Sequence, residues 1–369
     1  MKKQLLTTTA MVAAGVLVVS GPALAGKPKL TIGGYSKQII GIGDNSDAFD
    51  ALNGNRVNFD QHSDGEIHFN GSVALDNGIK IRTRVELESN QEGDQIDEHW
   101  MRISGSFGEI RMGSMDGAAQ AMTTGYLASW NTGVGLLLAF DTADWVSNPG
   151  TVSASTVGRV DTTSDGESIA YFTPRFSGFQ VGASWTPSTE EDVNNQRAAQ
   201  ANGDTEHVQV GLNFNKKMGS VGIGAAIGYA TSKENTANTS NNKILGGGVR
   251  VDFSGIRLSA SYVDRNDQTT NGVTAAAGQK TYEIGARYMM GPNAFGISHL
   301  SAEGQATTAA LGDGDTANVT FISYRRTLGP GVSWDVTGIL ADFDDNAPGA
   351  VAGNSNDGKA VATAITVRF

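Results

Sequence analysis

The sequence predicts an all-β protein, a 16-stranded antiparallel transmembrane β-barrel with short turns at one end and long polar loops at the other. Three observations predict this fold class. Apolar residues alternate with polar or small residues over segments of about ten residues. Short turns alternate with long polar connections along the chain. No run of about 18 apolar residues follows residue 25, so no membrane-spanning helix is expected.

Composition narrows the class of protein. The chain has 369 residues, of which 48 are glycine, 8 are proline and none is cysteine, and 39% are hydrophobic. The lack of cysteine excludes a disulfide-stapled secreted domain. The chain is too apolar to be disordered, yet its hydrophobic content is low for a large globular core. No basic patch suited to phosphates is present, so nucleic acid is not an expected partner.

Residues 1–25 have the features of a secretory signal peptide. Lys2 and Lys3 precede an apolar stretch from Leu5 to Val19, and Ala23-Leu24-Ala25 supplies small residues for cleavage. A transmembrane anchor is the alternative, but the apolar run is short and no stop-transfer pattern follows. Cleavage leaves residues 26–369 as one barrel domain, and the loss of two lysines changes the formal charge from −11 to −13.

The alternation is clearest in the predicted hairpin around Asp76-Asn77-Gly78, a turn sequence that tolerates positive φ. After this turn one face carries Ile79, Ile81, Thr83, Val85 and Leu87, and the other carries Lys80, Arg82, Arg84, Glu86 and Glu88. The first face suits lipid and the second suits a water-filled lumen. Taken alone, the hairpin would also fit a soluble sandwich with its charges in water.

The remaining elements follow in order from the same pattern and from a recurring short turn. The turns are Phe107-Gly108, Phe176-Ser177-Gly178, Met218-Gly219, Phe253-Ser254-Gly255, Met290-Gly291-Pro292 and Leu328-Gly329-Pro330. The expected strands cover residues 29–42, 64–76, 79–89, 97–105, 109–114, 167–174, 178–187, 205–215, 220–232, 243–253, 255–265, 280–290, 294–303, 316–327, 332–342 and 359–369. Their even number, with both termini at the short-turn end, allows antiparallel closure.

The order and spacing of several motifs resemble the trimeric general-diffusion porins of Gram-negative outer membranes, particularly their alphaproteobacterial branch. The matching pieces are the signal peptide, the strand Leu30–Tyr35, the hairpin at Asp76-Asn77-Gly78, the segment Gly105–Gly113, and a last strand whose final Phe369 looks like the family's assembly signal. The resemblance covers the whole mature chain. It implies a homotrimer in the outer membrane of a Gram-negative bacterium.

The resemblance further implies passive diffusion of small hydrophilic solutes and ions through a water-filled channel. Its implied partners are outer-membrane lipid, lipopolysaccharide and the outer-membrane assembly machinery. A third extracellular loop that narrows the barrel is expected at residues 114–166, the longest interval without a clean strand. Its apolar patch Val134–Phe140 could instead be another strand. The acidic Pro-Glu-Phe-type tip of enteric relatives is absent, which puts the identity of the constriction acids in doubt.

Charged residues on the predicted inner face are the candidate pore-lining residues. The basic candidates are Lys80, Arg82, Arg84, Arg111, Arg250, Arg257 and Arg287, and the acidic candidates in the long loop are Asp116, Asp141 and Asp144. Opposed rows of charge would create a transverse field, focused by low-dielectric walls, that orders water and penalises large apolar molecules. Each arginine could instead be a solvated or glutamate-paired residue away from the narrowest point. The acid excess predicts a weak preference for cations.

Other function classes find little support in the sequence. The five histidines form no metal-spaced pair, and no nucleophile elbow or phosphate loop is present, so neither an enzyme nor a cofactor is expected. His99 with Ser104 or Ser106 is the nearest candidate for a barrel hydrolase. The acidic clusters Asp342–Asp345 and Glu190–Asp192 are either solvated loops or Ca²⁺ sites that could bridge lipopolysaccharide. The alternative functions are a structural or adhesive barrel with an occluded lumen and a soluble secreted β-protein.

Overall fold

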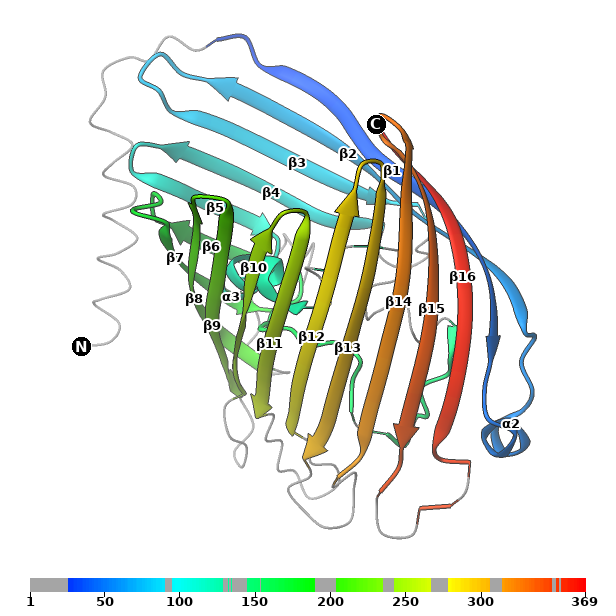
Figure 1. Ribbon diagram of the computed structural model, residues 1–369. Helices are drawn as coiled ribbons and strands as arrows, with labels where there is room; N and C mark the ends of the chain where they lie inside the picture. Colours follow the sequence, from blue (N-terminus) through cyan, green and yellow to red (C-terminus); the bar gives the residue numbers. More distant parts are fainter. Residues whose placement is uncertain are drawn as a thin grey trace.

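The chain folds into a closed barrel of 16 antiparallel strands, in which β1 pairs with both β2 and β16 (Figure 1). The computed structural model describes residues 26–89, 95–128, 132, 134, 145–152, 154–189, 204–234, 242–266, 278–305, 314–346, 350–351 and 353–369. The predicted fold class and number of strands are confirmed. The expected signal peptide, residues 1–25, lies outside the described residues.

Seven short turns join the strands at one end of the barrel and longer connections join them at the other (Figure 1). The strands are β1 Lys29–Asp44, β2 Phe59–Ala74, β3 Lys80–Glu88, β4 Ile96–Gly105, β5 Gly108–Ser114, β6 Glu167–Phe172, β7 Phe179–Ser188, β8 Asp204–Met218, β9 Val221–Glu234, β10 Lys243–Phe253, β11 Ile256–Asn266, β12 Gly278–Met290, β13 Asn293–Gln305, β14 Thr316–Gly329, β15 Val332–Asp344 and β16 Asn356–Arg368.

Three short helical segments complete the described elements: α2 Asp47–Asn53, α3 Ala118–Thr123 and the 3₁₀ turn η1 Thr124–Tyr126. None of the helices among the described residues is long and apolar enough to cross a membrane. The sequence did not predict α2. It is capped by the Ser46 hydroxyl, which accepts from the backbone N–H of Phe49 at 3.4 Å.

Several predicted strand boundaries are too short at the long-loop end. β2 begins at Phe59 rather than at residue 64, and β16 begins at Asn356 rather than at residue 359. The extra residues remain paired, because β1 extends to Asp44 and keeps Phe59 in register with Ile42. These residues were not predicted as strand because they are mostly polar, and the strands continue beyond the residues that alternate between apolar and polar.

The short turns use positive-φ residues, as expected for tight hairpins. Between β10 and β11 only Ser254 and Gly255 separate the paired ends, and their φ angles are 49° and 82°. A two-residue hairpin with positive φ at both central positions matches the right-handed twist of the flanking strands. The Phe-Ser-Gly motif in the sequence is therefore a turn signal.

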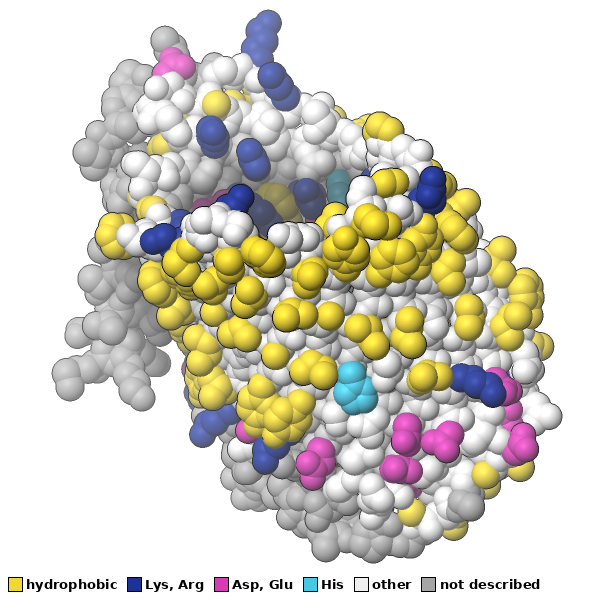
Figure 2. Space-filling view, in the orientation of Figure 1, with side chains coloured by type: hydrophobic (Ala, Val, Ile, Leu, Met, Phe, Trp, Pro, Cys, Tyr) yellow, Lys and Arg dark blue, Asp and Glu magenta, His cyan; other side chains and the backbone are white. Residues whose placement is uncertain are grey.

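Large apolar side chains cover the outer wall of the barrel. Ile284, Leu258 and Ile297 are 62%, 56% and 50% exposed, although an ordinary soluble fold would bury such residues. Figure 2 shows apolar side chains as a broad band across the visible face of the wall, with acidic side chains gathered towards the long-loop end. Closure also leaves no unpaired sheet edge, which lipid could not hydrogen-bond. The outer wall is therefore suited to a bilayer.

The C-terminal residue takes part in closing the barrel. The backbone N–H of Phe369 donates to the Gly34 carbonyl at 3.1 Å, and the Gly34 N–H donates to the Phe369 carbonyl at 3.0 Å. The phenylalanine ring itself is 64% exposed. The main chain of Phe369 therefore contributes to closure, whereas its side chain is free for contact with lipid or another protein.

Candidate functional site

The inner face of β3, β4 and β5 carries a row of three arginines, which we call the arginine row: Arg82, Arg102 and Arg111. Arg82 is the register partner of Arg102, and Arg102 is the register partner of Arg111. The Arg102 guanidinium lies 3.8 Å from the centre of the Trp100 ring, and that of Arg111 lies 4.1 Å from the Phe172 ring. Aromatic faces stabilise these cations and fix their positions on the wall.

A second basic group lies on the inner face of β10, β11, β12 and β14. Arg257 binds both carboxylate oxygens of Asp252, at 2.6 and 3.1 Å, and its register partner is Arg287. Arg325 donates to Asp335 at 2.6 Å. Figure 2 shows a hollow at the short-turn end of the molecule with Lys and Arg side chains around and within it. The inner face of these strands thus carries cations, of which Arg257 and Arg325 are paired with carboxylates.

Residues 115–166 connect β5 to β6, and we call them the inner segment; the part of it that the structure describes is bound to the inner face of the barrel. Its described backbone N–H groups donate to wall side chains: Ala118 to Ser184 at 2.9 Å, Ala128 to Ser261 at 2.8 Å and Ser155 to Gln279 at 3.0 Å. Ser184, Ser261 and Gln279 are buried, whereas Ala183 and Trp185, the neighbours of Ser184 in β7, are exposed on the outer face. Helix α3 therefore lies within the ring of strands (Figure 1).

Gln209 of β8 is a further wall residue, and it makes several hydrogen bonds to the inner segment. It is fully buried, and its amide nitrogen donates to Asp161 at 2.6 Å and to the Thr163 hydroxyl at 3.0 Å. Its amide oxygen accepts from the N–H groups of Ala119 at 3.1 Å and Gln120 at 3.4 Å. One side chain thus joins both ends of the inner segment to the wall.

Apolar contacts hold the inner segment as well. Trp145 and Val146 pack in one cluster with inner-face residues of β13 to β16, among them Val319, Phe321 and Ile339. Room for the tryptophan depends on Gly41, since a Cβ there would come within 2.2 Å of the Trp145 ring. Burial of such side chains contributes about 1.5–3 kcal/mol each. The inner segment is therefore packed against the wall as part of the fold.

The structure places all seven basic candidates on inner-face strand positions: Lys80, Arg82, Arg84, Arg111, Arg250, Arg257 and Arg287. Arg84 and Arg111 are paired with Glu86 and Glu109. Arg250 donates to the Gly125 carbonyl of the inner segment at 2.8 Å. Asp141 and Asp144 lie outside the described residues.

Asp116, at the start of the inner segment, is close enough to the wall to interact with Arg111. The pKa of its carboxyl is raised to about 6, mainly by burial and also by the carboxylates of Asp161 and Asp97, against the lowering effect of Arg159 and Arg111. The group is therefore able to change charge within the physiological pH range. The structure brings this predicted acid and one predicted arginine together.

Sequence reasoning missed Arg102, Arg325 and Gln209. Arg102 could have been found by reading the hairpin register across from Arg111, because register partners share one face of a sheet. Gln209 gives no such signal, since a glutamine on the inner face is equally compatible with contact to water. The structure does not bring His99 and Ser104 together as a barrel hydrolase would require. The two residues lie on opposite faces of β4, and the Ser104 hydroxyl contacts the Lys80 carbonyl at 3.5 Å.

A family model described as Gram-negative porin matches residues 7–346. The chain belongs to the Gram-negative porins. The resemblance found in the sequence motifs is confirmed. This porin is an outer-membrane channel for passive diffusion. No curated protein sequence matches the chain.

Solved porin structures share the fold of this porin at low sequence identity. The anion-selective porin of Comamonas acidovorans has a TM-score of 0.65 at 15% identity, over 93% of this chain and 100% of that one. OmpF of Salmonella typhi, in complex with daunomycin, has a TM-score of 0.62 at 16% identity, over 94% and 100%. OmpT of Vibrio cholerae, in its trimer form, has a TM-score of 0.58 at 10% identity, over 92% and 99%.

Proposed function

We propose that solutes cross this porin without any chemical step, through a lumen narrowed between the inner segment and the arginine row. The observation that carries this proposal is the attachment of the inner segment to the inner face, through Gln209 and the apolar cluster around Trp145. A connection held inside a barrel reduces its bore, so size and charge at that level select among solutes.

We propose a weak preference for cations. The mature chain has an excess of acidic residues, and several inner-face arginines are paired, namely Arg84, Arg111, Arg257 and Arg325. Pairing reduces the field that these arginines exert on passing ions. The excess of acidic residues then determines the sign of the potential, which attracts cations.

The proposal is tested with purified protein in planar bilayers under a KCl gradient, together with liposome swelling in a graded series of sugars. The expected results are open channels, a reversal potential of the sign for cations, and swelling rates that fall with sugar size. An anion-selective potential would contradict the charge argument. Absence of conductance would favour the alternative, a structural or adhesive barrel with an occluded lumen.

We propose that the protein assembles as a homotrimer, as OmpT of Vibrio cholerae does in the solved trimer form. Contact with lipid and lipopolysaccharide is supported by the exposed apolar wall. Calcium binding at Asp342, Asp344 and Asp345 remains a proposal, and Glu190–Asp192 lies outside the described residues. Light scattering of the detergent-solubilised protein would measure the number of copies, and a monomer would contradict the trimer.

Phe369→Ala is expected to reduce the amount of protein in the outer membrane several-fold. The exposed ring makes a small contribution to packing, and the backbone bonds to Gly34 persist in the variant, so the refolded barrel should lose no more than about 1 kcal/mol of stability. Membrane fractionation of cells and denaturant unfolding of refolded protein measure the two effects. An equal loss in both would mean that the ring acts in stability rather than in recognition by the assembly machinery.

Cation preference is expected to weaken as the pH falls below about 6, because Asp116 then binds a proton and the inner segment loses a negative charge.

The same carboxyl affects stability. Since the folded-state pKa of Asp116 is raised, the ionised carboxyl destabilises the fold. Asp116→Asn should therefore be more stable than wild type above about pH 6 and equally stable below about pH 4. Reversal potentials and unfolding midpoints across this range measure both effects. A wild-type pH profile retained in full by the asparagine variant would exclude Asp116 as its source.

A further inference from the structure

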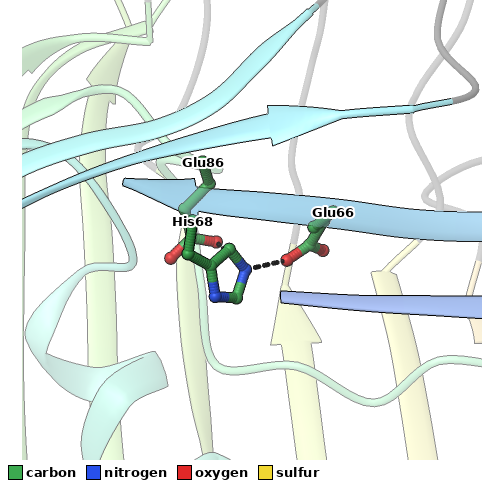
Figure 3. A group of neighbouring side chains, drawn as sticks. All are labelled: Glu66, His68 and Glu86. Atoms are coloured by element: carbon green, nitrogen blue, oxygen red, sulfur yellow. Dashed lines mark hydrogen bonds and ion pairs between the residues drawn. The ribbon is translucent and has the colours of Figure 1, made fainter. Parts of the chain in front are cut away.

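Three side chains with metal-ligating atoms meet on the inner face of β2 and β3: Glu66, His68 and Glu86 (Figure 3). His68 and Glu86 are register partners, and Glu66 shares their face because it lies two residues before His68. His68 Nε2 lies 2.6 Å from Glu66 Oε2 and 3.7 Å from Glu86 Oε2. One ligating atom of each residue lies within 4.8 Å of the other two.

Each carboxylate of this group is held through its other oxygen by a residue outside the group. The Tyr35 hydroxyl donates to Glu66 Oε1 at 3.1 Å, and Arg84 Nη1 donates to Glu86 Oε1 at 2.8 Å. Both Oε2 atoms are therefore directed at the imidazole. Outer partners that fix the ligands in this way are characteristic of built metal sites, where they orient the first ligands and tune their basicity.

The surroundings of the group favour a cation despite the charge of Arg84. Glu66 also belongs to a second set of approaching carboxylates, with Glu88 and Asp97, whose oxygens lie within 4.8 Å of one another. Glu88 and Asp97 therefore add negative charge next to Glu66. The three ligating side chains are only 9–18% exposed, which limits competition from bulk water, yet they face the lumen through which ions pass.

We propose that Glu66, His68 and Glu86 bind a divalent transition-metal ion of the Zn²⁺ class. One imidazole nitrogen and two carboxylate oxygens are a donor set that Zn²⁺ uses, with a fourth position left for water. Ligand atoms about 2.1 Å from a tetrahedral metal lie about 3.4 Å apart. The present separations of 2.6 and 3.7 Å bracket that value, so small side-chain rotations suffice.

Binding has two consequences. The metal takes the lone pair of His68 Nε2, so a proton on that nitrogen competes with the ion. The bound ion adds positive charge to the wall of the lumen, beside Arg84 and the Trp100 ring over which Arg84 lies at 5.3 Å. Cation conductance should therefore decrease when the site is filled; this second consequence rests on the proposed pore function.

The binding test uses the refolded full-length barrel in detergent. Calorimetry with ZnCl₂ measures affinity, and the visible absorption of Co²⁺ reports a protein-bound ion independently. His68→Gln is expected to weaken Zn²⁺ binding by at least about tenfold and to abolish the Co²⁺ spectrum. Glu86→Gln, which keeps an acceptor for Arg84, should weaken binding too. The matched control is His299→Gln, because His299 is on the outer face of β13 and contacts Thr320 at 2.8 Å.

The outcomes separate the metal site from the pore. Zn²⁺ binding that is unchanged by His68→Gln, or a wild-type barrel that forms channels but binds no Zn²⁺, overturns the site and leaves the porin function standing. His68-dependent binding by a preparation that forms no channels supports the site and contradicts the pore function. In bilayers, micromolar ZnCl₂ should lower single-channel conductance in wild type and in His299→Gln, and have no effect in His68→Gln.

Discussion

Gln209→Leu is expected to release the inner segment from the wall and to increase single-channel conductance. The glutamine side chain donates to Asp161 and to the Thr163 hydroxyl and accepts from two backbone N–H groups, all in a fully buried position. Leucine fills a similar volume but offers no polar partner, and each unsatisfied buried group costs about 1–3 kcal/mol. We therefore expect the inner segment to detach from the wall, because detachment lets water hydrogen-bond the unsatisfied groups. Detachment would widen the lumen.

Conductance in planar bilayers and the size limit for sugars in liposome swelling measure this release. The matched control is Gln61→Leu, because Gln61 is exposed on β2 and its amide donates to Gln38 at 3.0 Å and to the His62 carbonyl at 2.9 Å. The control should leave both measurements unchanged. A Gln209→Leu channel with wild-type conductance and size limit would show that the apolar contacts hold the inner segment without this residue.

The fold could be predicted because a membrane barrel imposes one rule on every strand. The outer face must satisfy lipid, so residues such as Leu258 and Ile284 recur with period two whatever lies inside. The turns add a second signal, since positive φ at Ser254 and Gly255 restricts the residue types allowed there. Neither signal depends on contacts between distant parts of the chain.

The inner face could be predicted only in part, because its contents depend on what covers it. Strand β15 has apolar residues on both faces near its end, with Ile339 and Phe343 buried inside and Leu340 outside. These inner residues are apolar because the inner segment packs on that side of the barrel, through Trp145 and Val146. Strict alternation of apolar and polar residues is therefore lost at this end of β15. A strand with apolar residues on both faces is one that is covered on both sides, here by lipid outside and by the inner segment inside.

The charged clusters were missed for a different reason. The histidines were compared by their spacing along the chain, yet His68 meets Glu86 across a hairpin, at positions 18 residues apart in the printed sequence. The same holds for Arg102, which lies between Arg82 and Arg111 once the register of two hairpins is known. Register follows from the turn geometry, so these groups could have been found from the short turns at Asp76-Asn77-Gly78 and Phe107.

Arg102→Glu is expected to shift the reversal potential strongly towards cation selectivity. Arg102 is the middle member of the arginine row, so the substitution replaces its charge and also leaves a carboxylate between Arg82 and Arg111 to neutralise them. The low-dielectric wall of a barrel concentrates the field of such groups on the water inside it. Arg102→Gln removes the charge without reversing it and should give an intermediate shift. Because both variants lose the contact between Arg102 and Trp100, Arg102→Gln also shows whether that loss alone prevents folding.

The matched control for charge reversal is Arg326→Glu, because Arg326 is exposed near the short turns and its neighbour in β14, Arg325, occupies the inner face. Both variants have the same net charge, so a difference between them isolates position. The shift caused by Arg102→Glu should shrink between about 0.1 M and about 1 M KCl, as the screening length falls from about 10 Å to about 3 Å. Equal shifts in the two variants would mean that selectivity follows total charge, and that the arginine row does not set it.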